Sequence, residues 1–167
     1  MSSDVILVIV VGTALAFDFT NGFHDTANVV ATSISTGAAR PSVAIGIAAL
    51  LNFAGAFISI SVAATVAKDV VDADVITPTI VFAGLIGAIA WNLITWSVGL
   101  PSSSSHALIG GVVGSSVAAV GFDAVIAEGL VGKVLIPAVI APVLALLVAG
   151  IGIGLIYRIV GRQRPGV

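Results

Sequence analysis

A stripe of polar side chains repeats at helical spacing inside a long apolar part of the chain. Its members recur at steps of three and four residues: Asp18, Asn21, Asp25, Asn28 and Thr32. That spacing places them on one face of a helix. The flanking segments, Val5–Phe17 and Val29–Ala31, are largely apolar. Because carboxylates and amides are costly inside a bilayer, we expect this polar stripe to be a functional site.

Composition places the chain in a membrane. Hydrophobic residues make up 59% of the 167 residues and charged residues only 8%, whereas soluble domains carry about 25% charged residues. We therefore expect an all-α, multi-pass protein of the cell membrane, with residues 1–167 forming one transmembrane domain in contact with the lipid bilayer. We expect no nucleic-acid partner. The sequence has no cysteine, which excludes disulfide and thiol chemistry.

Turns and loops divide the sequence into about five expected transmembrane segments. The first runs from Val5 to about Thr36, and we expect it to break near Thr20–Gly22, because glycine permits a local break and broken membrane helices line cavities. The other four are expected at Ser42–Val66, Thr79–Val98, Ser102–Val120 and Val134–Val160. The Ser-rich segment Ser102–Val120 is short, so it either crosses the membrane or re-enters from one side.

The placement of charges predicts the orientation in the membrane, because Lys and Arg concentrate in cytoplasmic loops. Arg40 marks one inner loop, and Arg158, Arg162 and Arg164 mark an inner C-terminus. The acidic loops then fall outside; they hold Asp69, Asp72, Asp74, Asp123 and Glu128. This gives five crossings with the N-terminus outside and the C-terminus cytoplasmic. An odd number of crossings, with one copy of each motif, predicts one half of an inverted-repeat transporter.

The polar stripe offers hard oxygen ligands. Asp25 and Asp18 provide carboxylates, Asn21 and Asn28 provide amide oxygens, and Thr32 provides a hydroxyl. On a broken helix with freed carbonyls, such ligands suit a small hard cation such as Na⁺. The alternative is structural, since amides and hydroxyls also bond across membrane helices. Two Asp and two Asn at one spacing favour the functional site, because buried carboxylates are so costly.

A second motif, Gly99–His106, reads GLPSSSSH. Proline stands where a helix begins and the serines fill its first turn: Ser102, Ser103, Ser104 and Ser105. A helix start binds anions through its free N–H groups and partial positive charge, and the hydroxyls add donors. The motif therefore predicts an oxyanion site, with a plain helix cap as the alternative. Because no Lys or Arg lies in the interior of any expected span, a co-bound cation would supply the countercharge, which is the physical basis of symport.

Two histidines and two glycine pairs lie outside these arguments. His24 and His106 are either proton carriers or hydrogen-bonded packing residues. Two glycine pairs fit close helix packing, Gly110 with Gly114 and Gly150 with Gly154.

Both motifs match one known family. The first pattern, N-G-x-x-D-x-A-N followed by A-T, is present as Asn21, Gly22, Asp25, Ala27, Asn28, Ala31 and Thr32. The second, G-L-P-x-S-x-[ST]-H, is present as Gly99, Leu100, Pro101, Ser103, Ser105 and His106. In these residues the sequence resembles the inorganic phosphate transporters, the relatives of the eukaryotic sodium–phosphate cotransporters. The resemblance covers nearly the whole chain but only the first half of a family member.

The resemblance implies two inverted repeats with phosphate and coupling ions bound between them. It assigns cation and phosphate binding to Asn21, Asp25 and Asn28, and phosphate binding to Ser102–Ser105. This chain lacks the second repeat and its motif. We therefore expect a second half, as a homologous chain, as a second copy in a homo-oligomer, or as the rest of a longer chain.

The leading functional hypothesis is cation-coupled symport of inorganic phosphate, driven by Na⁺ or H⁺, without an organic cofactor. A permease for sulfate or another oxyanion is an alternative within the same family. A second alternative is an intramembrane hydrolase with one serine of 102–105 as nucleophile, His106 as base and a buried Asp as orienter. The absence of a G-x-S-x-G elbow argues against it. A passive pore is the third alternative.

Overall fold

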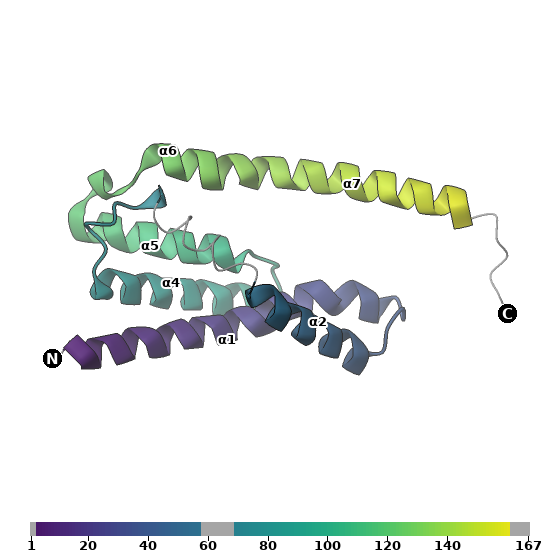
Figure 1. Cartoon of the computed structure of the whole chain (residues 1–167), viewed down its shortest axis with the longest axis horizontal. Coiled ribbons are helices and arrows are strands. Elements are labelled where there is room, and N and C mark those ends of the chain that lie inside the picture. Colours follow the sequence, from purple (N-terminus) through teal and green to yellow (C-terminus); the bar gives the residue numbers. More distant parts are fainter. Residues whose placement is uncertain (1–2, 58–68, 161–167) are drawn as a thin grey trace. The chain divides into compact units, whose positions relative to one another are not determined.

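The computed structural model describes residues 3–57 and 69–160, and most of these are helical (Figure 1). In chain order the helices are α1 (Ser3–Ser35), α2 (Pro41–Ala56), α4 (Pro78–Ser97), α5 (Ser104–Val120), the short 3₁₀ turn η1 (Phe122–Ala124), α6 (Ala127–Leu130), the π-helical turn η2 (Val131–Leu135) and α7 (Ile136–Val160). The expected all-α membrane fold is confirmed. The chain forms two compact units, Met1–Ala127 and Glu128–Val167.

Each expected transmembrane segment contains an apolar helix. Three helical stretches are long and apolar enough to cross a membrane: Asp4–Ser35, Pro78–Ser97 and Ala127–Val160. Two shorter apolar helices, Pro41–Ala56 and Ser104–Val120, match the remaining segments. The later part of the expected segment Ser42–Val66, from residue 58 on, lies outside the described residues.

The expected break in the first helix is wrong, because α1 runs unbroken from Ser3 to Ser35. Two threonine hydroxyls donate hydrogen bonds to backbone carbonyls of the same helix. Thr20 Oγ1 donates to the Phe17 carbonyl at 2.8 Å, and Thr26 Oγ1 donates to the Gly22 carbonyl. Gly22 does not adopt a positive φ. The polar stripe therefore lies on a continuous helix, and no freed carbonyl from a helix break is available as a cation ligand.

Helices α1 and α4 lie side by side and run in the same direction (Figure 1). Phe17 packs in one apolar cluster with Leu85 and Ala88. One step of seven residues further along both helices, His24 meets Thr95. This parallel register brings the polar stripe of α1 up to the end of α4, where the Ser-rich motif begins.

Helix α5 packs against α4 in the opposite direction, and two glycines allow the backbones to touch. A Cβ added to Gly111 would fall against the carbonyl oxygen of Gly84. A Cβ added to Gly84 would lie 3.0 Å from the backbone of Val112. Among the described residues Gly110 and Gly114 make no such close approach, since a Cβ on either would meet nothing within 4 Å, and a packing role for them stays a prediction.

The two acidic loops meet at one end of the first unit. Val71 and Val125 form an antiparallel bridge. Ile126 N–H donates to the Val70 carbonyl, and Asp72 N–H donates to the Ala124 carbonyl, both at 3.0 Å. The loops that the charge pattern predicts on one side of the membrane are therefore neighbours in space. Which side that is stays a prediction.

Candidate functional site

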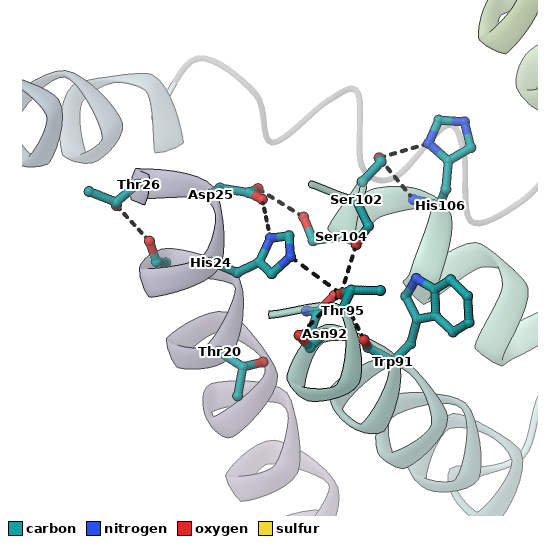
Figure 2. Close-up of polar contacts among 12 residues, drawn as sticks. Thr20, His24, Asp25, Thr26, Trp91, Asn92, Thr95, Ser102, Ser104 and His106 are labelled. Atoms are coloured by element: carbon teal, nitrogen blue, oxygen red, sulfur yellow. Dashed lines mark hydrogen bonds and ion pairs between the residues drawn. The ribbon is translucent and has the colours of Figure 1, made fainter. Parts of the chain in front are cut away.

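Polar side chains from α1, α4 and the start of α5 gather in one place (Figure 2). We call His24, Asp25, Thr95, Ser102 and Ser104 the polar cluster. Ser104 Oγ donates a 2.9 Å hydrogen bond to Asp25 Oδ2, and His24 Nδ1 lies 3.1 Å from Asp25 Oδ1. The fold thus joins the two motifs that the sequence singled out, although 79 residues separate Ser104 from Asp25.

A tight turn after α4 puts the serines in position. Gly99 has a φ of +69°, a left-handed conformation that glycine adopts without steric cost. The Leu100 N–H donates a hydrogen bond to the Thr95 carbonyl at 2.9 Å, so the chain folds back over the last turn of α4. This turn brings Ser102 Oγ within 3.1 Å of Thr95 Oγ1.

The four serines have different environments and do not converge on one point. Ser102 pairs with Thr95, and Ser104 is buried against Asp25. Ser103 caps α5, accepting from the His106 N–H at 3.3 Å and pairing with His106 Nδ1 at 2.7 Å. Ser105 is exposed. The helix cap that was considered as an alternative therefore accounts for Ser103, while Ser102 and Ser104 belong to the polar cluster.

Histidine 24 holds the centre of the polar cluster. Its ring is 3% exposed, and both ring nitrogens have neighbours. Nδ1 faces Asp25, and Nε2 lies 3.4 Å from the hydroxyl of Thr95. Because a carboxylate only accepts hydrogen bonds, the ring donates its Nδ1–H to Asp25. Spacing alone left the role of His24 open, since its partner at Nε2, Thr95, comes from another helix.

A groove of about 570 Å³ runs along α4 and α5 beside the polar cluster. Its walls are mostly glycine, alanine and the indole of Trp91, and its polar lining comes from Ser102, Ser103 and His106. The hydroxyl groups of Ser102 and Ser103 therefore border an open space large enough for a small anion. The first intrahelical hydrogen bond of α5 runs from the Ala107 N–H to the Ser103 carbonyl. The backbone N–H groups of Ser104 and Ser105 come before it, so they take no part in the hydrogen bonds within the helix.

The polar stripe divides into an inner and an outer part. Asp25 and Asn21 lie partly covered, and the side-chain oxygen of Asn21 is buried without a hydrogen-bond partner in the part of the chain that the structure describes. Asp18, Asn28 and Thr32 are exposed on α1. Among the described residues no group of three or more His, Cys, Asp or Glu side chains could hold a metal ion.

Asparagine 92 is a polar residue whose importance the sequence did not reveal. It lies in α4, one turn before Thr95, and it is fully buried. Neither its amide nitrogen nor its amide oxygen has a hydrogen-bond partner among the described residues. Because α1 and α4 run in parallel and His24 meets Thr95, Asn92 lies level with Asn21, three residues earlier on each helix. A buried amide without partners indicates a position that a ligand or a water molecule satisfies.

Comparisons with known proteins identify the family of the chain. The model of the phosphate transporter family matches residues 21–166. A probable low-affinity inorganic phosphate transporter of Mycobacterium tuberculosis (strain ATCC 25618 / H37Rv) is 60% identical over 153 residues, covering 92% of this chain and 37% of the relative. The corresponding Bacillus subtilis (strain 168) protein is 48% identical over 143 residues, covering 84% of this chain and 43% of the relative.

A solved structure has the same fold. It is described as "the sodium-dependent phosphate transporter", with a TM-score of 0.83 and 30% identity. The match covers 92% of this chain and 39% of that structure. The chain therefore spans less than half the length of each of these three proteins.

Proposed function

Because the chain belongs to the phosphate transporter family, we propose that it supplies one half of a cation-coupled phosphate symporter. The observation that carries the proposal is the hydrogen bond between Ser104 and Asp25, which joins the anion motif to the carboxylate motif. The chain's coverage of 37–43% of the relatives described above supports a second half. The sodium dependence of the structural relative favours Na⁺ over H⁺ as the coupling ion.

The contacts of Asp25 suggest how the two substrates depend on each other. A phosphate anion near a bare carboxylate is repelled, and a low-dielectric environment strengthens that repulsion. A cation bound to Asp25 removes the repulsion. It also competes with Ser104 for Oδ2, so the Ser104 hydroxyl becomes free to donate to the anion. Cation binding thus prepares the phosphate site, which couples the binding of the two substrates.

The proposed ligands come from both parts of the polar stripe. Asp25 and Asn21 hold the cation from within this chain, and Asp18, Asn28 and Thr32 extend the site toward the proposed second half. Phosphate is bound by Ser102–Ser105, together with Asn28 and the cation on Asp25. Asn21 supports this assignment because its buried oxygen has no protein partner.

The hydrolase alternative is wrong, because the chain belongs to a family of transporters. The Ser103–His106 pair has a structural explanation: the Ser103 oxygen caps α5 by accepting the His106 N–H. The two remaining alternatives are a family permease for another oxyanion and a passive pore. The transport experiment described next distinguishes both from phosphate symport.

The test uses the assembly purified through a tag on this chain and reconstituted in sealed liposomes. We expect radiolabelled phosphate to accumulate when an inward Na⁺ gradient is imposed. Uptake that ignores both Na⁺ and H⁺ gradients would contradict symport and favour a pore. Stronger competition by sulfate than by unlabelled phosphate would favour the sulfate permease.

The substitution Asp25→Asn tests the carboxylate. It keeps the size and one oxygen ligand but removes the charge, so the Na⁺ concentration for half-maximal uptake should rise at least tenfold. Asp123→Asn is the matched control, since this carboxylate is exposed in η1. Equal Na⁺ dependence in wild type and Asp25→Asn would assign Asp25 a structural role.

A further inference from the structure

We propose that His24 is a positioning residue that couples the cation site to the phosphate site. The inference rests on the proposed function and concerns how its two halves communicate. Figure 2 shows the contacts that carry it. The buried imidazole lies between Asp25 and Thr95, and Thr95 in turn lies 3.1 Å from Ser102.

Two routes connect the carboxylate on α1 to the serines before and at the start of α5. The direct route is the hydrogen bond from Ser104 to Asp25 Oδ2. The second route leaves from Oδ1 and passes through His24 and Thr95 to Ser102. Each carboxylate oxygen therefore has its own connection to the phosphate motif.

Burial makes the imidazole a rigid connection. The ring of His24 is 3% exposed, whereas the side chain of Asp25 is 44% exposed and has its other oxygen bonded to Ser104. Donation from Nδ1 holds one carboxylate oxygen in place. Thr95 is buried, and its single hydroxyl hydrogen can go either to His24 Nε2 or to a backbone carbonyl such as that of Trp91 at 2.9 Å, so the direction of this hydroxyl depends on the imidazole.

The far end of this route reaches the groove. Ser102 belongs to the polar lining of the groove, where its hydroxyl borders the open space. A shift of the Asp25 carboxylate on cation binding moves the hydrogen-bond partner of His24, and through Thr95 it reorients the Ser102 hydroxyl. Such coupling is reciprocal, so phosphate binding tightens the cation site by the same factor.

Two substitutions separate the two arms of the ring. In His24→Asn the side-chain amide occupies the place of Nδ1, so the Asp25 contact is kept and the Thr95 contact is lost. In His24→Gln the amide reaches the place of Nε2, so the Thr95 contact is kept and the Asp25 contact is lost. Each variant then reports on one arm of the connection.

The readouts are the half-saturating Na⁺ concentration and the half-saturating phosphate concentration at low and high Na⁺, in liposomes holding the tagged assembly. A lost hydrogen bond corresponds to about a two- to tenfold change. His24→Gln should raise half-saturating Na⁺ by that factor. His24→Asn should keep half-saturating Na⁺ within about twofold, while the gain in phosphate affinity from added Na⁺ shrinks by about two- to tenfold.

Thr20→Val is the matched control. Thr20 is a buried polar residue of α1 whose hydroxyl bonds only to its own helix, at Phe17. It should change neither half-saturating concentration. If a His24 variant is lost from the membrane, Thr95→Val and Thr95→Ser decide the question. Thr95→Val should reproduce the weakened coupling, and Thr95→Ser, which keeps the hydroxyl, should restore it.

Equal shifts in both His24 variants, or changes only in the maximal rate, would assign His24 to packing and overturn the inference while phosphate symport stands. Unshifted half-saturating concentrations in both variants would do the same. A wild-type assembly that shows no ion-driven phosphate uptake would overturn the proposed function and, with it, this coupling role.

Discussion

Replacing Ser104 with alanine tests the contact that joins the two motifs. The change removes a hydroxyl that donates to Asp25 at 2.9 Å, and alanine leaves no unsatisfied polar group at this 4% exposed position. A hydrogen bond to a charged group contributes about 1.5–3 kcal/mol. Because the side chain of Asp25 is 44% exposed, water replaces part of the lost bond. We therefore expect an interaction energy of about 1 kcal/mol, a fivefold effect on an equilibrium constant.

A double-mutant cycle isolates this energy from other effects of the substitutions. The cycle combines Ser104→Ala with Asp25→Ala, because an asparagine at position 25 would still accept a hydrogen bond. The free energy of unfolding is measured in detergent micelles by denaturant titration. Intrinsic fluorescence is a local probe, since both tryptophans, Trp91 and Trp96, lie in α4.

The matched control pairs Asp25→Ala with Ser105→Ala. Ser105 is the neighbouring serine and is exposed, so these two changes should add to within about 0.5 kcal/mol. If Ser104→Ala and Asp25→Ala are equally additive, the hydrogen bond contributes nothing to stability and the proposed link between the motifs loses its main support.

Two further changes test the surroundings of the site. Gly111→Ala should lower the melting temperature markedly, with a cost of about 1–3 kcal/mol from overpacking against Gly84, while Gly110→Ala, which meets nothing within 4 Å, should not; equal melting temperatures for the two variants would contradict the close approach of α4 and α5. Asn92→Leu removes a buried amide that has no partner, so the melting temperature should stay equal or rise while phosphate uptake falls; a large loss of stability would show that the amide is already bonded within the protein.

The meeting of the two motifs is the part of the site that could be predicted from the sequence. Polar residues are so costly in a membrane that their presence on α1 and at the start of α5 already indicates a common functional site. The structure adds the pairing itself, in which Ser104 reaches Asp25 and Ser102 reaches Thr95. No local pattern distinguishes these serines, because their roles follow from the turn at Gly99 and the register of α1 against α4.

The state of the first helix could not be predicted from its glycine. Gly22 permits a break but does not require one, and the Thr26 hydroxyl bonds to its carbonyl within the helix. Which glycine of α5 packs against α4 could not be predicted either. Adjacent positions on a helix point about 100° apart, so whether Gly110 or Gly111 faces α4 depends on how the helices cross rather than on the sequence of α5.

The division of the polar stripe gives a physical reason for a second half. On α1, Asp25 and Asn21 lie beside the contact with α4, while Asp18, Asn28 and Thr32 are exposed. Insertion scales assign about 2.5–3.5 kcal/mol to one aspartate at the centre of a membrane helix, and lipid cannot satisfy amides or hydroxyls. Residues of one stripe that face outward in this way stabilise the protein only when another polar surface covers them. We therefore infer that the proposed second half completes the cation site from the outer side of α1, while the contacts of Asp25 with His24 and Ser104 form its inner side.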